Sequence, residues 1–62
     1  MTYADILAKQ IEISPRQVQA VIEMLDEGNT IPFIARYRKE RTGSLDEEHL
    51  RKVESGVERL RS

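Results

Sequence analysis

The four letters SPRQ, Ser14 to Gln17, fix the start of a helix more firmly than any other stretch of this sequence. A serine here can accept a hydrogen bond from a first-turn amide, and the Gln17 side chain can bond back to the serine amide. Pro15 suits the first helical position, where its missing N–H would have no partner. Apolar residues then recur at helical spacing at Val18, Val21, Ile22 and Leu25. Gly28 can take the left-handed conformation that ends a helix, so a helix runs from Pro15 toward Gly28.

A first helix precedes this one. Thr2 can cap it, and Asp5 three positions later can bond back in a variant of the same capping arrangement. Apolar residues at helical spacing follow at Tyr3, Ile6, Leu7 and Ile11. The pattern predicts a helix from Tyr3 to Ile11, and the short link to the next helix predicts a compact helical hairpin.

The stretch NTIPF, Asn29 to Phe33, predicts a turn followed at once by a third helix. Proline is well suited to begin a helix and pushes the residue before it out of helical geometry. We expect the helix over Phe33 to Glu40, with Gly43 ending it. On a helical wheel Phe33, Ile34 and Tyr37 form an apolar arc, which should face the other helices.

A fourth helix is predicted after Ser44, with the Ser44 side chain as its cap and Glu47 as the returning partner. Its apolar residues form a narrow, coiled-coil-like seam of Leu50, Val53, Val57 and Leu60. Gly56 weakens this helix by about 1 kcal/mol relative to alanine. No stop signal precedes Ser62, so we interpret the chain as the amino-terminal fragment of a longer protein. An uncovered seam would then favour self-association.

These patterns predict an all-α fold, a small bundle of three to four helices in an orthogonal or helix-turn-helix-like arrangement, with the last helix projecting. The 62 residues fit a single domain, and 39% hydrophobic with 34% charged residues is typical of a helical, soluble chain. The predicted core consists of Ile6, Leu7, Val18, Val21, Ile22, Leu25, Ile31, Ile34, Tyr37, Leu50, Val53 and Val57.

Composition argues against catalysis and cofactors. The chain has no cysteine and one histidine, His49, which lacks partners for a metal site or for acid–base chemistry. The consecutive carboxylates Asp46 to Glu48 point around a helix and do not converge. No apolar run could span a membrane, so we expect a cytoplasmic protein without a membrane partner. We predict no enzyme activity, no metal and no cofactor.

The most unusual feature is a cluster of cations beside aromatic residues, made of Arg36, Arg38, Lys39 and Arg41. The net charge of −1 means that any nucleic-acid site must be local. Three interpretations stay open: ion pairs with Asp26, Glu27 and Asp46 to Glu48, a surface for RNA or DNA, or a docking surface for a protein partner. Because Arg38 projects within the apolar arc, we predict that it bonds to a carboxylate or to helix-end carbonyls.

The segment LDEGNTIPFIARYRKERTGSLDEEHLRKVESGVERL, Leu25 to Leu60, resembles the amino-terminal region of the Tex family of bacterial transcription accessory proteins. The resemblance implies a much longer cytoplasmic protein that binds nucleic acid, chiefly through a carboxy-terminal OB-type RNA-binding domain. It also implies that this segment is a scaffold and interaction module, in contact with the remainder of the parent polypeptide and with the transcription machinery. It assigns no catalytic residue to this segment.

Overall fold

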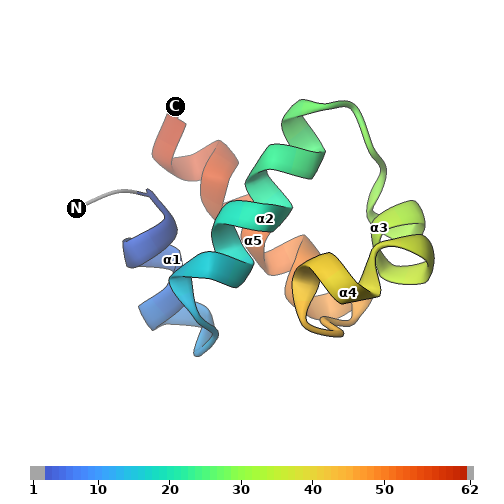
Figure 1. The fold of residues 1–62 in the computed structure, drawn as a ribbon. Coiled ribbons are helices and arrows are strands. Elements are labelled where there is room, and N and C mark those ends of the chain that lie inside the picture. The colour runs from blue at the N-terminus through green and yellow to red at the C-terminus, as the bar shows by residue number, and fades with distance from the viewer. Residues whose placement is uncertain (1–2, 62) are drawn as a thin grey trace.

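This computed structural model describes residues 3–61, which form an all-α bundle. Figure 1 shows α1 at one end of the bundle, α3 and α4 at the other, and α5 crossing behind α2. No strand occurs among these residues, so the predicted fold class is confirmed. The helices are α1 (Tyr3–Ile11), α2 (Pro15–Asp26), α3 (Ile31–Tyr37), α4 (Lys39–Thr42) and α5 (Glu47–Arg61).

The first two helices form the expected hairpin, and the predicted bounds of α1 are confirmed. The predicted cap at Thr2 lies outside the described residues. The capping box of α2 is present: the Gln17 amide donates to Ser14 Oγ over 3.2 Å, and the Ser14 amide donates to Gln17 Oε1 over 3.0 Å. Gly28, at a φ of 96°, ends α2 with its amide donating to the Leu25 carbonyl.

The predicted third helix is divided into two. Thr30 caps α3 by accepting the Phe33 amide at 3.4 Å, so the helix begins at Ile31, ahead of Pro32. It ends at Tyr37, because Arg38 leaves helical geometry with φ −126° and ψ 31°. The single turn α4 follows and ends at Gly43, in the left-handed conformation. The predicted continuous helix from Phe33 to Glu40 is therefore wrong, since the break redirects α4 toward α2.

The cap of α5 also differs from the prediction. Ser44 lies in the left-handed region with a φ of 67°, and its side chain does not cap the helix. Asp46 caps α5 instead, because its Oδ1 accepts the His49 amide at 2.9 Å. The extended backbone that an N-cap needs is absent at Ser44, so of the two overlapping capping patterns the later one, at Asp46, forms.

The core lies where α5 packs against α1, α2 and α3. The seam of α5 is covered by the chain's own helices: Leu50 and Val53 are fully buried, and Val57 is nearly so. The expected uncovered seam is therefore absent from the described residues, and with it the argument for self-association through this helix. At its far end α5 is tied to α2 by an ion pair between Arg61 and Asp26, so the helix packs along the bundle and does not project from it.

Most of the predicted core residues are buried, with three departures. Ile6 and Leu25 are only half-buried, and Tyr37 is 56% exposed. The prediction for Tyr37 is wrong because Ile31 and Ile34 fill the inner side of α3. The buried core that the structure describes contains Ala4, Leu7, Ala8, Val18, Val21, Ile22, Met24, Ile31, Ile34, Leu45, Leu50, Val53 and Val57. None of the described helices has the length and apolar character needed to cross a membrane.

Candidate interaction surface

An aromatic–cation surface covers the outer side of α3 and the start of α4. We define it by Phe33, Arg36, Tyr37, Arg38 and Lys39. The β-branched side chains of Ile31 and Ile34, one helical turn apart, take the inner side of this short helix. Phe33 and Tyr37, which form their own i, i+4 pair, are thereby left facing solvent, 36% and 56% exposed. Exposed large aromatic residues of this kind are enriched at protein interfaces.

The two rings are held between two guanidinium groups. The ring centroids of Phe33 and Tyr37 lie 5.2 Å apart with an interplanar angle of 48°. The Arg38 Cζ lies 5.0 Å from the Phe33 centroid, and the Arg36 Cζ lies 5.8 Å from the Tyr37 centroid. Both separations permit cation–π attraction. The result is a row of arginine, tyrosine, phenylalanine and arginine side chains in mutual contact.

Arg38 has a second restraint. Its Nη1 donates to the Tyr37 carbonyl over 3.1 Å, at the last residue of α3. This is a bond to a helix-end carbonyl, so the expectation for Arg38 is confirmed. The guanidinium is consequently fixed by a ring on one side and by the backbone on another, with other N–H groups left for a ligand.

Arg41 is separated from this surface, because it turns toward α2. Its guanidinium nitrogens lie 3.8 Å from a Glu23 oxygen and 3.9 Å from a Glu27 oxygen. All three side chains are substantially exposed, so these pairs contribute little to stability. Their effect is to take one of the four predicted cations out of the candidate surface.

Arg36 and Lys39 form no ion pair with any other residue between positions 3 and 61. They border a shallow groove together with Pro32, Ala35 and Glu47. Among the carboxylates expected to balance the cluster, Glu27 does pair with it through Arg41, but the rest have other partners. These pairs are Asp26 with Arg61, Asp46 with His49, Glu47 with Arg51, and Glu48 with Lys52.

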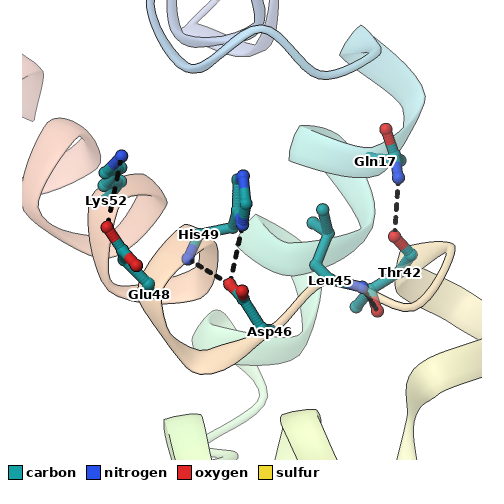
Figure 2. A network of polar contacts seen from close by, with 7 residues as sticks. All are labelled: Gln17, Thr42, Leu45, Asp46, Glu48, His49 and Lys52. Atoms are coloured by element: carbon teal, nitrogen blue, oxygen red, sulfur yellow. Dashed lines mark hydrogen bonds and ion pairs between the residues drawn. The ribbon is translucent and has the colours of Figure 1, made fainter.

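A partly buried polar contact joins α4 to α2. Gln17, already part of the capping box, donates from Nε2 to the Thr42 carbonyl over 2.9 Å. Thr42 is itself buried, and its hydroxyl donates to the Lys39 carbonyl and accepts the Leu45 amide, both at 3.3 Å. Figure 2 shows this contact beside the start of α5. No local pattern in the sequence predicts this bond, because Gln17 and Thr42 lie 25 residues apart in the chain.

The single histidine has a structural role at the start of α5. His49 Nδ1 lies 2.7 Å from Asp46 Oδ1, which also accepts the His49 amide. The hydrogen bond from the His49 backbone amide lowers the pKa of the Asp46 carboxyl below its ordinary value, and the contact with the His49 ring lowers it further by a smaller amount. No cluster of histidine, aspartate and glutamate within residues 3–61 could hold a metal ion.

A bidentate ion pair joins the far ends of α2 and α5. Arg61 Nη1 and Nη2 donate to the two carboxylate oxygens of Asp26, each over 3.1 Å. These hydrogen bonds hold the pKa of Asp26 below its ordinary value and raise that of Arg61. The pair therefore links the last residue of α2 to the last residue of α5, with both side chains substantially exposed.

Comparison with known protein families shows which family the chain belongs to. The family model described as "Tex-like protein N-terminal domain" matches residues 1–62. The chain belongs to the Tex-like protein family. Among its Tex-like relatives, "Protein YhgF" of Escherichia coli strain K12 is 52% identical over 60 residues, covering 97% of this chain and 8% of that protein. The family resemblance seen in the sequence is thereby confirmed.

Two further relatives of this chain carry informative names. "Transcriptional accessory protein Tex" of Neisseria gonorrhoeae is 46% identical over 61 residues, covering 98% of this chain and 8% of that protein. The human "S1 RNA-binding domain-containing protein 1" is 40% identical over 57 residues, covering 92% of this chain and 6% of that protein. The chain thus spans less than a tenth of the length of each of these relatives. No solved structure matches it.

Proposed function

We propose that this chain is a non-catalytic helical interaction module of a Tex-like transcription accessory protein, acting in the cytoplasm. The single observation that carries the proposal is the aromatic–cation surface. Its aromatic and arginine side chains contact one another, Arg38 also bonds to the backbone, and the helix α3 is anchored through Ile31 and Ile34. A rigid, exposed set of aromatic and arginine side chains on a packed helix is suited to binding.

Membership of the Tex-like family supports a place for this module in transcription, because one relative of this chain is named as a transcriptional accessory protein. As a single-domain module it would contact the remainder of a longer parent polypeptide through its helical body. Binding, and not bond-making chemistry, is then its contribution. The polar side chains that lie in close contact here serve as helix caps and as ties between helices.

The proposal is tested by comparing this chain with a longer Tex-like polypeptide that contains it. A scaffold role predicts that the longer polypeptide raises the free energy of unfolding of α1, α2 and α5, measured by amide hydrogen exchange. Equal exchange rates in the two contexts would contradict the scaffold role. A partner-binding role makes a different prediction. Arg36→Gln together with Tyr37→Ala should weaken the association of the longer polypeptide with the transcription machinery, without changing amide exchange in its other helices. Unchanged association would contradict the partner-binding role.

A second candidate function is direct contact with RNA or DNA. It is favoured by the unpaired cations Arg36 and Lys39, which lie on neighbouring turns of the same surface. Fluorescence anisotropy with short single-stranded and duplex probes tests it, because phosphate contacts make affinity fall steeply with salt. Binding that weakens with salt and is lost in Arg36→Gln with Lys39→Gln supports nucleic-acid contact. An affinity that changes neither with added salt nor with the double substitution excludes direct nucleic-acid contact by this surface.

A further inference from the structure

We propose that the aromatic–cation surface binds an acidic segment of a second protein, with carboxylates on its two arginines and an apolar side chain in the adjoining groove. The inference deepens the proposed function, on which it rests, by naming the chemistry of the partner. Three features support it: the two guanidinium groups that contact the aromatic rings, the groove beside them, and the distribution of charge around both.

The first step concerns carboxylate recognition. Arg38 is restrained by the Phe33 ring and the Tyr37 carbonyl, and Arg36 lies over the Tyr37 ring. A planar guanidinium held in this way presents its free N–H groups in a fixed fork, which matches a carboxylate bidentately. Because Arg38 already contacts a ring and a backbone carbonyl, its binding to a carboxylate costs less side-chain entropy than that of an unrestrained arginine. Two carboxylates on one extended or helical segment can meet the two arginines.

The second step concerns the groove next to Arg36. Its apolar wall is formed by Pro32 and Ala35, while Arg36, Lys39 and Glu47 supply its polar rim. An apolar side chain of the partner can pack against Pro32 and Ala35, while an adjacent carboxylate forms an ion pair with Lys39. Glu47 lies on the same rim but is paired with Arg51 at 3.7 Å, which reduces its repulsion toward an acidic ligand.

The third step separates an acidic protein segment from a nucleic acid. Bases stack on aromatic faces, but an arginine already lies over each ring and the two rings contact each other, which reduces the aromatic area left for stacking. A long polyanion also needs an extended positive field. Here Glu23 and Glu27 flank Arg41, Glu47 borders the groove, and the whole chain carries a net charge of −1. A short segment with few negative charges fits this local cation cluster better.

The fourth step separates a second protein from a permanent contact within one polypeptide. Permanent interfaces are strongly apolar and resemble a domain core, whereas transient ones keep charged residues at the rim. The aromatic–cation surface has two aromatic rings among three cations, and all five side chains retain exposure to solvent. Its composition therefore matches a transient partner.

The experiment uses this chain, with its fold checked by circular dichroism, and two labelled peptide probes. One probe alternates glutamate and leucine, and the matched probe has glutamine in place of every glutamate. Backbone amide shifts in the ¹H–¹⁵N spectrum locate the binding site, and fluorescence anisotropy gives the affinity. We expect the acidic probe to shift amides of α3 and α4, and the glutamine probe to bind at least about tenfold more weakly.

Variants sharpen the result. Arg36→Gln with Arg38→Gln should weaken binding of the acidic probe by at least about tenfold. Arg16→Gln with Arg59→Gln removes the same charge from exposed positions elsewhere and should leave the affinity within about twofold. Glu47→Gln should strengthen binding, because it removes a negative charge from the rim of the groove.

Several outcomes overturn the proposal: no binding of the acidic probe, equal losses in the two double variants, or tighter binding of single-stranded RNA at the same amides. Loss of acidic-probe binding when the chain is placed in a longer Tex-like polypeptide would also overturn it, because the surface would then be covered within one molecule. In that last case the slower amide exchange predicted for a scaffold would still appear, so failure of this inference is distinguishable from failure of the proposed function.

Discussion

The seam of α5 and the outer side of α3 both carry apolar side chains at helical spacing, yet they have opposite environments. Leu50 and Val53 are fully buried beneath α1, α2 and α3, while Phe33 and Tyr37 face solvent. From the sequence, the seam was expected to lie uncovered and Tyr37 to lie in the core. Helical periodicity therefore shows which side chains share a side of a helix, but not what lies against that side.

The difference follows from how many neighbours each helix has. α5 is long and central, so three other helices contact its apolar side. α3 has only seven residues at one end of the bundle, and its two isoleucines are sufficient to fill the space that the other helices leave. Its aromatic residues instead contact arginines, which keep their charges in water.

The largest expected effect comes from the covered side. Leu50→Ala should lower the free energy of unfolding by about 2 to 5 kcal/mol, because the side chain is fully buried and its loss leaves a cavity. Urea unfolding followed by circular dichroism measures the change. A loss of less than about 1 kcal/mol would mean that the seam of α5 is not covered as described.

The second prediction tests how closely α5 approaches α1. A β-carbon at Gly56 would collide with the buried Leu7 side chain. Overpacking costs about 1 to 3 kcal/mol, whereas alanine gains about 1 kcal/mol of helix propensity. Gly56→Ala should therefore destabilise the fold by about 1 kcal/mol net.

The control for Gly56→Ala is Ser55→Ala, at an exposed position in the same helix. It should be neutral or stabilising by a few tenths of a kcal/mol, since no neighbour is displaced and alanine is the better helix former. Thermal unfolding of the two variants side by side gives the comparison. Equal stabilisation by both substitutions would show that α1 and α5 are further apart at Gly56.

The third prediction concerns the exposed side. Tyr37→Ala should cost less than about 1 kcal/mol of stability, because it removes an aromatic pair and a cation–π contact but no core residue. Denaturant unfolding measures it against Leu50→Ala. If Tyr37→Ala lowered the free energy of unfolding as much as Leu50→Ala, the outer side of α3 would not differ from the buried seam of α5.

The smallest expected effect is a decrease in the free energy of unfolding at acid pH, caused by the two aspartates that pair with residues at the ends of α5. The pKa values of Asp26 and Asp46 in the fold lie below the ordinary value of 3.8, so their ionised forms favour folding. Their contribution is complete above that value and is lost as the pH falls through the lowered pKa values. Asp26→Asn and Asp46→Asn should each flatten the dependence of unfolding free energy on pH below about 4. Profiles parallel to that of the unaltered chain would contradict this assignment.

Local chemistry in the sequence determined the first two helices and the interior of the last. Ser14, Pro15 and Gln17 specify the start of α2 through bonds within four consecutive residues, and Gly28 specifies its end through backbone freedom. Such features depend only on near neighbours in the chain, so they can be read without knowing the fold. The cations of the candidate surface were likewise identified from sequence, as was the bond from Arg38 to a helix-end carbonyl, but the cation–π contacts of Arg36 and Arg38 were not.

Tertiary structure alone decided the break at Arg38, the cap at Asp46 and the exposure of Tyr37. In each case the local sequence allows two arrangements. The segment after Thr30 can form one helix or two, and either Ser44 or Asp46 can cap α5. Either the aromatic or the aliphatic side of α3 can face the core. Long-range contacts, such as the bond from Gln17 to the Thr42 carbonyl, act on these alternatives from outside the local sequence. The choice thus depends on atoms far away in sequence, and it is this choice that creates the aromatic–cation surface.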